Sequence, residues 1–332
     1  MAENAAYDVS ATRIKAKFNA LFHQLYLDAD RDYRVAWLLA GSGRSGTTWA
    51  AEVLNYDQRY RFLVEPFNNG RVPQCSVFTL RQYLRPGDTD ERFLSAARAI
   101  FTGRIRNDWT DSLTRIAVYR ARMIKDVRCT LMLGWIRRNF PGMPIVFMLR
   151  HPCAVANSRV KLRWTTKLRE TFCAQPQLMS DYLAPFDYWL TSSCEAFEAH
   201  VIDWCVENYV PLMQLQTGDA QVVFYERLCM DPAGELKRLC AQIGRPFDAA
   251  MLDFIGRPSA SPRISARHQK PPSGEQLAFG WRPNVTAGDF SRAGEIVESF
   301  GLSHVYGNGL EPKIDNALES FVKRPTPALN LG

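Results

Sequence analysis

The sequence has no apolar run of about 18 residues, the length that a membrane-spanning helix needs, so no such helix is expected. Its first ten residues lack the apolar segment of a secretory signal peptide. Its 8 cysteines include no Cys-x-x-Cys pair, which argues against a zinc site and against a redox motif. We therefore expect reduced, structural thiols, no bound metal and a cytoplasmic protein.

Charge is distributed unevenly along the 332 residues. The net charge of +7 favours anionic ligands. Ten arginines stand between Pro66 and Arg122 against five acidic residues, and two interpretations are open: an ordinary solvated surface, or a basic cap over an anionic or sugar-like ligand. No aromatic-basic alternation and no recognition helix is present, so no nucleic-acid partner is expected. The arginines are Arg71, Arg81, Arg85, Arg92, Arg98, Arg104, Arg106, Arg115, Arg120 and Arg122.

Short apolar runs alternate with helical patterns. Unbroken runs at 35–40 and 144–149 are typical of strands buried on both faces of a parallel sheet. Strands are also predicted at 61–65, 123–127 and 221–225. One helix is predicted to begin at 47, a second to follow residue 127 and end at about 139, a third to span 154–164, and a fourth to begin after 231. This alternation predicts an α/β, P-loop-like three-layer fold with a mostly parallel central sheet. Ligands of such sheets bind at the carboxyl ends of the strands.

The whole chain, 1–332, is expected to form one domain with three additions to the sheet. Residues 1–30 form an N-terminal helical extension, because apolar residues recur at helical spacing between 11 and 26. That helix packs either on the body or on a second subunit, as in a homodimer. Residues 67–122 form a largely helical insertion that acts as a cap, and residues 259–282 form a loop that covers the ligand.

The most specific pattern is Gly-Ser-Gly-Arg-Ser-Gly-Thr-Thr-Trp at 41–49, between a buried strand and a helix. Its glycines let backbone N–H groups point at an anion, and the helix N-terminus adds positive potential. In nucleotide-hydrolysing P-loops a Lys follows the last Gly, but here Thr47 follows Gly46 and the cation stands earlier, at Arg44. This difference argues against a kinase or another ATP-using enzyme.

A second pattern lies about a hundred residues further on, at 147–158. Arg150 ends a predicted strand, and a helix that begins near Pro152 brings Ser158 back toward Arg150. A guanidinium and a hydroxyl together suit a terminal phosphate monoester. Tyr225, at the end of a later strand, is a weaker candidate for a contact with the ligand.

These patterns resemble the 5′-phosphosulfate loop and the 3′-phosphate motif of the sulfotransferases that use 3′-phosphoadenosine 5′-phosphosulfate (PAPS). The resemblance implies PAPS as donor, 3′-phosphoadenosine 5′-phosphate (PAP) as by-product, and a leaving phosphate neutralised by Arg44. It also implies that Tyr225 contacts the adenosine and that the loop at 262–270 closes over the donor. The donor contacts are then Arg44, Ser45, Gly46, Thr47, Thr48, Trp49, Arg150, Ser158, Tyr225, Arg263, Arg267 and Lys270.

The general base is where the sequence departs from the phenol- and steroid-sulfating members of that family. Those members have a His after a Lys-Thr, whereas residues 125–128 here read Lys-Asp-Val-Arg. Glu65, followed by Pro at a strand end, resembles the catalytic Glu of carbohydrate-type members. Lys125 either stabilises charge as the sulfuryl group leaves or pairs with a neighbouring acid. The alternative bases are Asp126, His151 and His268.

The resemblance therefore implies a sulfotransferase with a small-molecule or glycan acceptor. With Glu65 as base and an arginine-rich acceptor cap, we expect the hydroxyl of a sugar, a glycolipid or a glycosylated natural product. The alternatives are a phenolic or other non-sugar acceptor, an ATP-dependent small-molecule kinase, and a non-catalytic anion-binding protein.

Overall fold

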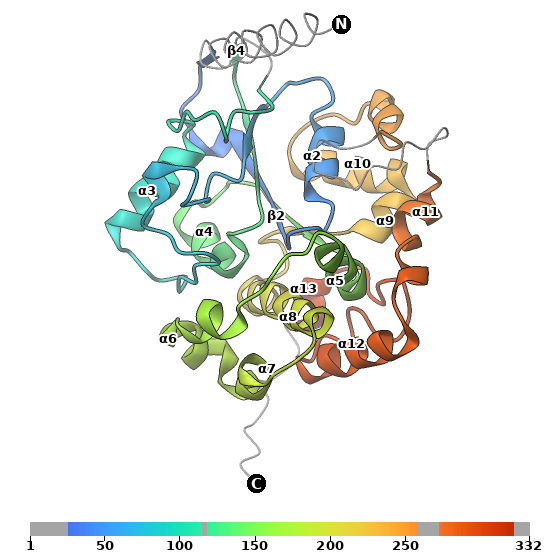
Figure 1. The fold of residues 1–332 in the computed structure, drawn as a ribbon. Helices are drawn as coiled ribbons and strands as arrows, with labels where there is room; N and C mark the ends of the chain where they lie inside the picture. The colour runs from blue at the N-terminus through green and yellow to red at the C-terminus, as the bar shows by residue number, and fades with distance from the viewer. Residues whose placement is uncertain (1–25, 115–117, 258–271, 322–332) are drawn as a thin grey trace, which may run out of the picture.

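A sheet of five strands forms the centre of the structure, a computed structural model that describes residues 26–114, 118–257 and 272–321 (Figure 1). The strand order is β3-β5-β2-β6-β7, and each neighbouring pair is parallel. The predicted α/β class with a mostly parallel central sheet is confirmed. The strands are β2 (Ala36–Gly41), β3 (Arg61–Val64), β5 (Arg122–Asp126), β6 (Ile145–Leu149) and β7 (Gln221–Phe224).

Side chains of the central strand β2 alternate between two buried clusters, one on each face of the sheet. Leu38 belongs to the first cluster, and Trp37 and Leu39 belong to the second. A strand buried on both faces needs an unbroken apolar sequence, which is what β2 has. The first face is covered by α4 (Leu133–Asn139), α5 (Pro152–Lys161), α8 (Ala196–Gln214) and α12 (Ala287–Ser299), and the second by α2 (Thr47–Leu54), α9 (Tyr225–Met230) and α10 (Pro232–Gln242).

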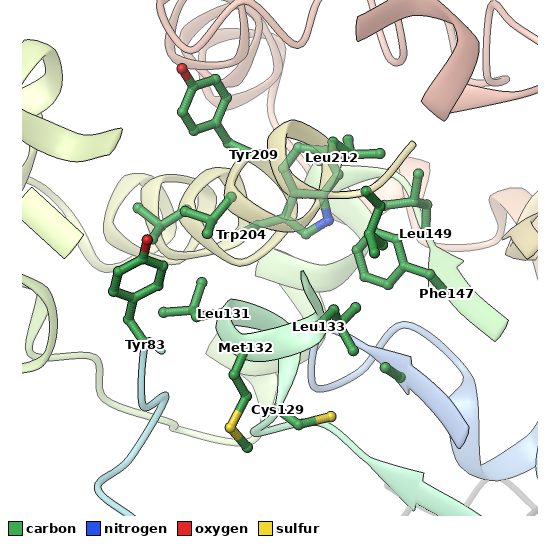
Figure 2. Packing of buried hydrophobic residues seen from close by; sticks show 14 of the residues in the cluster. Tyr83, Cys129, Leu131, Met132, Leu133, Phe147, Leu149, Trp204, Tyr209 and Leu212 are labelled. Carbon is green, nitrogen blue, oxygen red and sulfur yellow. The ribbon is translucent and has the colours of Figure 1, made fainter. Parts of the chain in front are cut away.

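Helix α8 runs through the first cluster, and Figure 2 shows its Trp204, Tyr209 and Leu212 among the side chains packed there. Phe147 of β6 packs in the same cluster, as does Tyr83 from the insertion at 67–122. The insertion thus buries apolar side chains in the main core and does not form a separate core of its own.

The order of the strands reverses at β2. After β2 the chain forms β3 and β5 on one side of it, and then crosses to form β6 and β7 on the other side. Ligands of open parallel sheets bind in the crevice at the carboxyl ends of the strands that flank such a reversal. The topology therefore predicts a ligand site among the segments that follow β2, β5 and β6.

The insertion is less helical than predicted. Within 67–122 the structure has one α-helix, α3 (Glu91–Phe101), a 3-10 turn at Pro73–Cys75 and the short strand β4 (Val118–Tyr119); most of the other described residues form turns and loops. Gly70, Pro73 and the Pro-Gly pair at 86–87 interrupt helical hydrogen bonding between Phe67 and α3. Arginine content alone says nothing about such breaks.

The N-terminal segment also differs from the prediction. Leu27–Asp28 form strand β1, which pairs in parallel with β4, so the predicted helical extension does not continue to residue 30. The Asp28 carboxylate is buried in ion pairs with Arg61 at 3.0 Å and Arg122 at 2.7 Å. These long-range ion pairs hold this segment extended against the sheet. The predicted helix at 11–26 lies outside the described residues, apart from Tyr26, which is not helical.

Two smaller differences concern strand ends and loops. Tyr225 begins α9 and does not end the preceding strand, because β7 stops at Phe224. The predicted loop at 259–282 contains the helix α11 (Gly274–Phe279), which Ser273 and Gln276 start with a reciprocal capping box. The predicted contacts Arg263, Arg267 and Lys270, and the alternative base His268, lie outside the described residues.

The remaining elements are short. All eight cysteines are free, and six of them are buried. None of the helices in the described ranges is both long and apolar enough to cross a bilayer. The further α-helices are α6 (Pro176–Leu178), α7 (Asp187–Thr191) and α13 (Ala317–Phe321), and 3-10 or π turns occupy Tyr33–Val35, Thr130–Met132, Arg169–Cys173, Met179–Leu183, Ala184–Phe186, Ala249–Phe254 and Arg282–Asn284.

Candidate functional site

A cavity of about 820 Å³ lies at the carboxyl ends of the strands. Each of the five strands contributes a residue at or just beyond its end: Gly43 after β2, Glu65 after β3, Lys125 in β5, Arg150 after β6 and Tyr225 after β7. Convergence from five strands identifies this cavity as the candidate active site. Among the described residues, no group of three or more His, Cys, Asp or Glu side chains is arranged to hold a metal ion.

Most of the predicted site residues line this cavity. Ser45 and Ser158 are not part of its lining, although both lie beside residues that are. The predicted residues that line it are Arg44, Gly46, Thr47, Thr48, Trp49, Glu65, Lys125, Arg150 and Tyr225.

The loop from Gly41 to Gly46 turns sharply into α2. Arg44 and Gly46 both have left-handed backbones, with φ of 80° and 96°. No side chain in the described part of the chain caps the N-terminus of α2, so the N–H groups of its first turn face the cavity without a side-chain acceptor. Such a helix end is a binding site for an anionic group. The predicted phosphate loop therefore has the backbone geometry that its sequence indicated.

The second predicted pattern meets this loop directly. Arg150 Nη1 donates a hydrogen bond to the carbonyl oxygen of Arg44 at 3.2 Å, and its guanidinium lies 4.1 Å from the ring centroid of Tyr225. Ser158 Oγ accepts a hydrogen bond from Arg44 Nε at 3.1 Å. Ser158 and Arg150 therefore both contact Arg44: Ser158 contacts its side chain, and Arg150 contacts its backbone.

Side chains of helix α8 form hydrogen bonds with both of the predicted phosphate segments. Trp204 Nε1 donates to the carbonyl oxygen of Arg150 at 3.0 Å. One turn further on, Asn208 Nδ2 donates to Ser42 Oγ in the phosphate loop, also at 3.0 Å. None of the residues of α8 was predicted from the sequence to belong to the site. The available signal was a set of polar residues within an otherwise apolar helix, which is costly unless each one has a partner.

Glu65 lies opposite the phosphate loop, between two cations. Its Oε1 accepts a hydrogen bond from Lys125 Nζ at 2.6 Å, and its Oε2 lies 4.0 Å from Arg128 Nε. The backbone N–H of Glu65 donates to the carbonyl oxygen of Lys125 at 2.7 Å, which holds the residue at the sheet edge. Its φ of 44° is unfavourable for a residue with a side chain, and such strain is concentrated at functional sites. Of the two interpretations of Lys125, the structure shows pairing with a neighbouring acid, which is Glu65; the stabilisation of charge during transfer stays a prediction.

The alternative bases are placed less favourably. Asp126 is fully buried, and its carboxylate accepts the backbone N–H groups of Phe67 and Arg128. Burial, and then repulsion by Glu65, raises the pKa of Asp126 to about 6. His151 is buried, caps α5 and stacks on Trp281, and burial lowers its pKa to about 3. Neither side chain is part of the cavity lining.

The remaining wall of the cavity is largely apolar and aromatic, which the sequence analysis missed. Trp164 and Leu80 are 43% and 46% exposed, and Trp109 also contributes to this wall. Trp164 lies just after α5, where Arg163 has a left-handed backbone with φ of 54°. Large apolar side chains exposed together in a cavity are typical of a binding surface.

Many of the described arginines of the insertion are paired within the protein. Five of the ten have acidic partners, and the guanidinium of Arg71 lies 5.4 Å from the ring centroid of Trp109. Half of the charges that suggested a basic cap are therefore paired with acidic groups of the protein. The five ion pairs are Arg81 with Asp203 and Glu207, Arg85 with Asp181, Arg92 with Asp90, Arg98 with Glu91, and Arg122 with Asp28.

Three features of the site fit a ligand with phosphate or sulfate groups. A Cβ at Gly46 would lie 2.4 Å from the Tyr225 ring, so only glycine permits this path of the loop. Within the described part of the chain, Ser45 Oγ and Arg150 Nε are buried without a hydrogen-bond partner. Buried polar atoms normally have partners, and a bound ligand with several acceptor and donor groups supplies them. The residues present therefore fit the implied donor PAPS.

The fold and the site define an α/β protein whose strand-helix turn has the geometry of a phosphate loop but lacks the lysine of nucleotide hydrolases. A family model described as "Sulfotransferase family" matches residues 38–249, well over half of the chain. The chain belongs to the sulfotransferase family, which confirms the family predicted from the two phosphate patterns.

Individual relatives are more distant. The chain is 27% identical over 229 residues to the nodulation protein NoeE of Sinorhizobium fredii (strain NBRC 101917 / NGR234), a match that covers 66% of this chain. The match covers 51% of NoeE, so this chain spans about half the length of that curated relative.

Solved structures of sulfotransferases also match. A sulfotransferase domain from the curacin biosynthetic pathway is 15% identical, with a TM-score of 0.46, over 80% of this chain and 97% of that one. Mouse sulfotransferase SULT7A1 complexed with PAP is 15% identical, with a TM-score of 0.40, over 82% of this chain and 86% of that one.

Proposed function

We propose that this protein transfers the sulfuryl group of PAPS to a hydroxyl of a sugar, a glycolipid or a glycosylated natural product, with Glu65 as the general base. One observation carries the proposal: Glu65, held by Lys125, lies in the same cavity as the loop of Arg44 and Gly46. A base and an anion-binding loop in one cavity are what sulfuryl transfer to a hydroxyl requires.

The reaction assigns one task to each of these groups. The acceptor oxygen forms a bond to sulfur while the bond from sulfur to the 5′-phosphate oxygen breaks, and PAP leaves. Glu65 Oε2 takes the proton of the acceptor hydroxyl, because Oε1 is engaged by Lys125. Arg44 and the N–H groups at the start of α2 stabilise the negative charge that grows on the leaving phosphate.

Lys125 is suited to a second task. It is only 4% exposed, and its ammonium group reaches the cavity beside Glu65. When the Glu65 carboxylate takes up a proton, the ion pair with Lys125 weakens, and the ammonium then interacts more strongly with the oxygens of the sulfuryl group. Lys125 thus stabilises charge during transfer and orients the base before it.

The 3′-phosphate of PAPS is assigned to Arg150 together with Ser158. The contact between Arg150 and the Arg44 backbone supports this assignment, because it brings a second guanidinium next to the phosphate loop. Tyr225, which packs on both Gly46 and Arg150, is proposed to contact the adenosine. A kinase reading is not supported, because Thr47 stands where ATP-binding loops have lysine.

An uncharged acceptor is favoured over an anionic one. Half of the insertion's arginines are paired with acidic groups, while Leu80, Trp109 and Trp164 offer an apolar wall. Apolar and aromatic walls with a few convergent polar groups are typical of sites for small organic ligands. The same wall also suits a flat phenolic acceptor, which stays the second candidate. Sugars and phenols tested side by side with labelled PAPS would separate the two.

The variant Glu65→Gln tests the assignment of the base. It keeps the size of the side chain but cannot accept the proton, so we expect turnover to fall by about a hundredfold or more. The affinity for PAP, measured by calorimetry, is expected to change little. Asp126→Asn is the matched comparison, in which turnover is retained. Full activity of Glu65→Gln would assign the role of base to another group.

Other expectations stay proposals. We propose that residues 1–332 form one domain, that the segment 259–282 covers the donor, and that the protein acts in the cytoplasm. Part of that segment supports its role, because Pro272, Gln276 and Trp281 line the cavity. A homodimer formed through the N-terminal segment is likewise a proposal, and sedimentation of the full chain tests it.

A further inference from the structure

Four charged side chains form a closed, buried ring behind the phosphate loop. Asp203 and Glu207 lie one turn apart on α8, Arg159 comes from α5, and Arg81 comes from the insertion. Arg159 contacts Asp203 at 2.8 Å and Glu207 at 2.7 Å. Arg81 contacts the same two carboxylates, both at 2.8 Å. Each carboxylate is thus shared by the two guanidinium groups.

The ring is connected to the phosphate loop through Arg159 and through a hydrogen bond between the Glu207 carboxylate and Ser42. Arg159 Nε and Nη2 both donate to the carbonyl oxygen of Gly43, at 3.1 and 3.0 Å. The Arg159 side chain has no exposed surface, so its position is set by these hydrogen bonds and by its two acidic partners. The orientation of the Gly43 peptide, and with it the path of the loop toward Arg44, depends on the ring.

Arg81 is held in the ring from the insertion side as well. Its backbone has a left-handed conformation with φ of 54°, and its carbonyl oxygen accepts a hydrogen bond from Gln175 Nε2 at 3.0 Å. Its guanidinium lies 5.8 Å from the ring centroid of Phe172. Both Arg81 and Glu207 also line the cavity. Arg81 therefore connects the insertion, on the proposed acceptor side of the cavity, to helix α8. This helix in turn hydrogen-bonds to the phosphate loop on the proposed donor side.

Charge balance gives the ring a consequence for donor binding. Two guanidinium groups and two carboxylates sum to zero. Without Arg81, one negative charge is left uncompensated in a buried position beside the loop, which is costly and pulls Arg159 toward the acids. The ligand of this loop is itself polyanionic, so the same charge also repels it.

We propose that Arg81 is a positioning residue that couples the insertion to the phosphate loop: by completing the ring with Asp203, Glu207 and Arg159, it fixes the Gly43 carbonyl and keeps the donor site free of excess negative charge. The proposal rests on the proposed function in that PAP serves as the probe. It also assigns Arg81 to the donor site, although it lies in the segment expected to contact the acceptor.

Calorimetric titration of the full-length protein with PAP tests this assignment. We expect Arg81→Met to weaken PAP binding by about tenfold or more, which corresponds to about 1.4 kcal/mol. In the double variant Arg81→Met/Glu207→Gln the ring is neutral again, and we expect most of the PAP affinity to return. Arg85→Met is the matched control. It removes another guanidinium of the same insertion, one that pairs with Asp181 outside the ring, and we expect the PAP affinity to stay unchanged.

The outcomes separate charge from folding. Unchanged PAP affinity in Arg81→Met would overturn the proposal. Lost affinity that the double variant does not restore would also overturn it, since the role of Arg81 would then be only to hold the fold. Thermal unfolding of each variant shows whether the fold is intact. If the wild-type protein itself does not bind PAP, the proposed function fails, which is a different result.

Discussion

At the scale of single residues, Gly46 is a position at which the phosphate loop has little conformational freedom. Its φ of 96° and the Tyr225 ring above it exclude a side chain. We predict that Gly46→Ala lowers PAP affinity by about tenfold or more, because a new methyl group must displace either the ring or the loop. Calorimetry with PAP is the measurement.

Gly218 provides the matched control for that variant. It has nearly the same backbone, with φ of 92°, but a Cβ there would meet no atom within 4 Å. Both alanine variants should lose about 1 kcal/mol of unfolding free energy from the left-handed backbone. Only Gly46→Ala should lose PAP affinity. Equal PAP affinity in the two variants would contradict the view that the loop holds the ligand.

Single residues also show where the sequence was informative. Arg44, Gly46 and Glu65 were predicted because their local pattern specifies both the turn and the chemistry. That Ser158 and Arg150 both contact Arg44 was not predicted, since side-chain contacts depend on rotamers that neighbours in space select. The ring around Arg81 was missed for the same reason: Arg81 and Glu207 are 126 residues apart in the sequence.

At the scale of elements, the start of α5 depends on a histidine that is neutral in the folded protein. His151 Nδ1 accepts the N–H of Cys153, and burial lowers the pKa of His151 to about 3, from an ordinary value of 6.5. Between those values the unfolded chain binds more protons than the folded one. This group's contribution to stability is therefore lost as the pH falls from 6.5 toward 3.

We predict that His151→Asn makes the stability of the protein less dependent on pH in this window. Asn keeps an acceptor for the helix start but has no titration, so the slope of unfolding free energy should become shallower by about 1.4 kcal/mol per pH unit. Denaturant unfolding between pH 4 and 6.5 measures the slope. A measurement at pH 7.5 isolates the loss of packing against Trp281, and equal slopes for both proteins would contradict the prediction.

Elements differed in how well the sequence specified them. Strands β2 and β6 were predicted to within one or two residues, because a strand buried on both faces needs a continuous apolar run. The insertion was predicted to be largely helical and is not. Its turns are decided by scattered Gly and Pro residues, and its side chains are ordered by packing on the main core, which no local pattern records.

At the scale of the whole molecule, the cavity lies where the carboxyl ends of the five parallel strands meet. Parallel topology was predicted from the alternation of strands and helices, and it explains why Glu65 and Arg150, far apart in sequence, line one cavity. The hydrogen bonds from α8 to Ser42 and Arg150 were not predictable, since they join elements that are distant in sequence.

The most direct test of the central claim compares the binding of PAP and 5′-AMP to the wild-type protein by calorimetry. The two ligands differ in the 3′-phosphate, which we assign to Arg150 with Ser158. Charge-assisted hydrogen bonds to that group predict that PAP binds about tenfold to a hundredfold more tightly. Equal affinities would contradict both the 3′-phosphate site and the assignment of PAPS as donor.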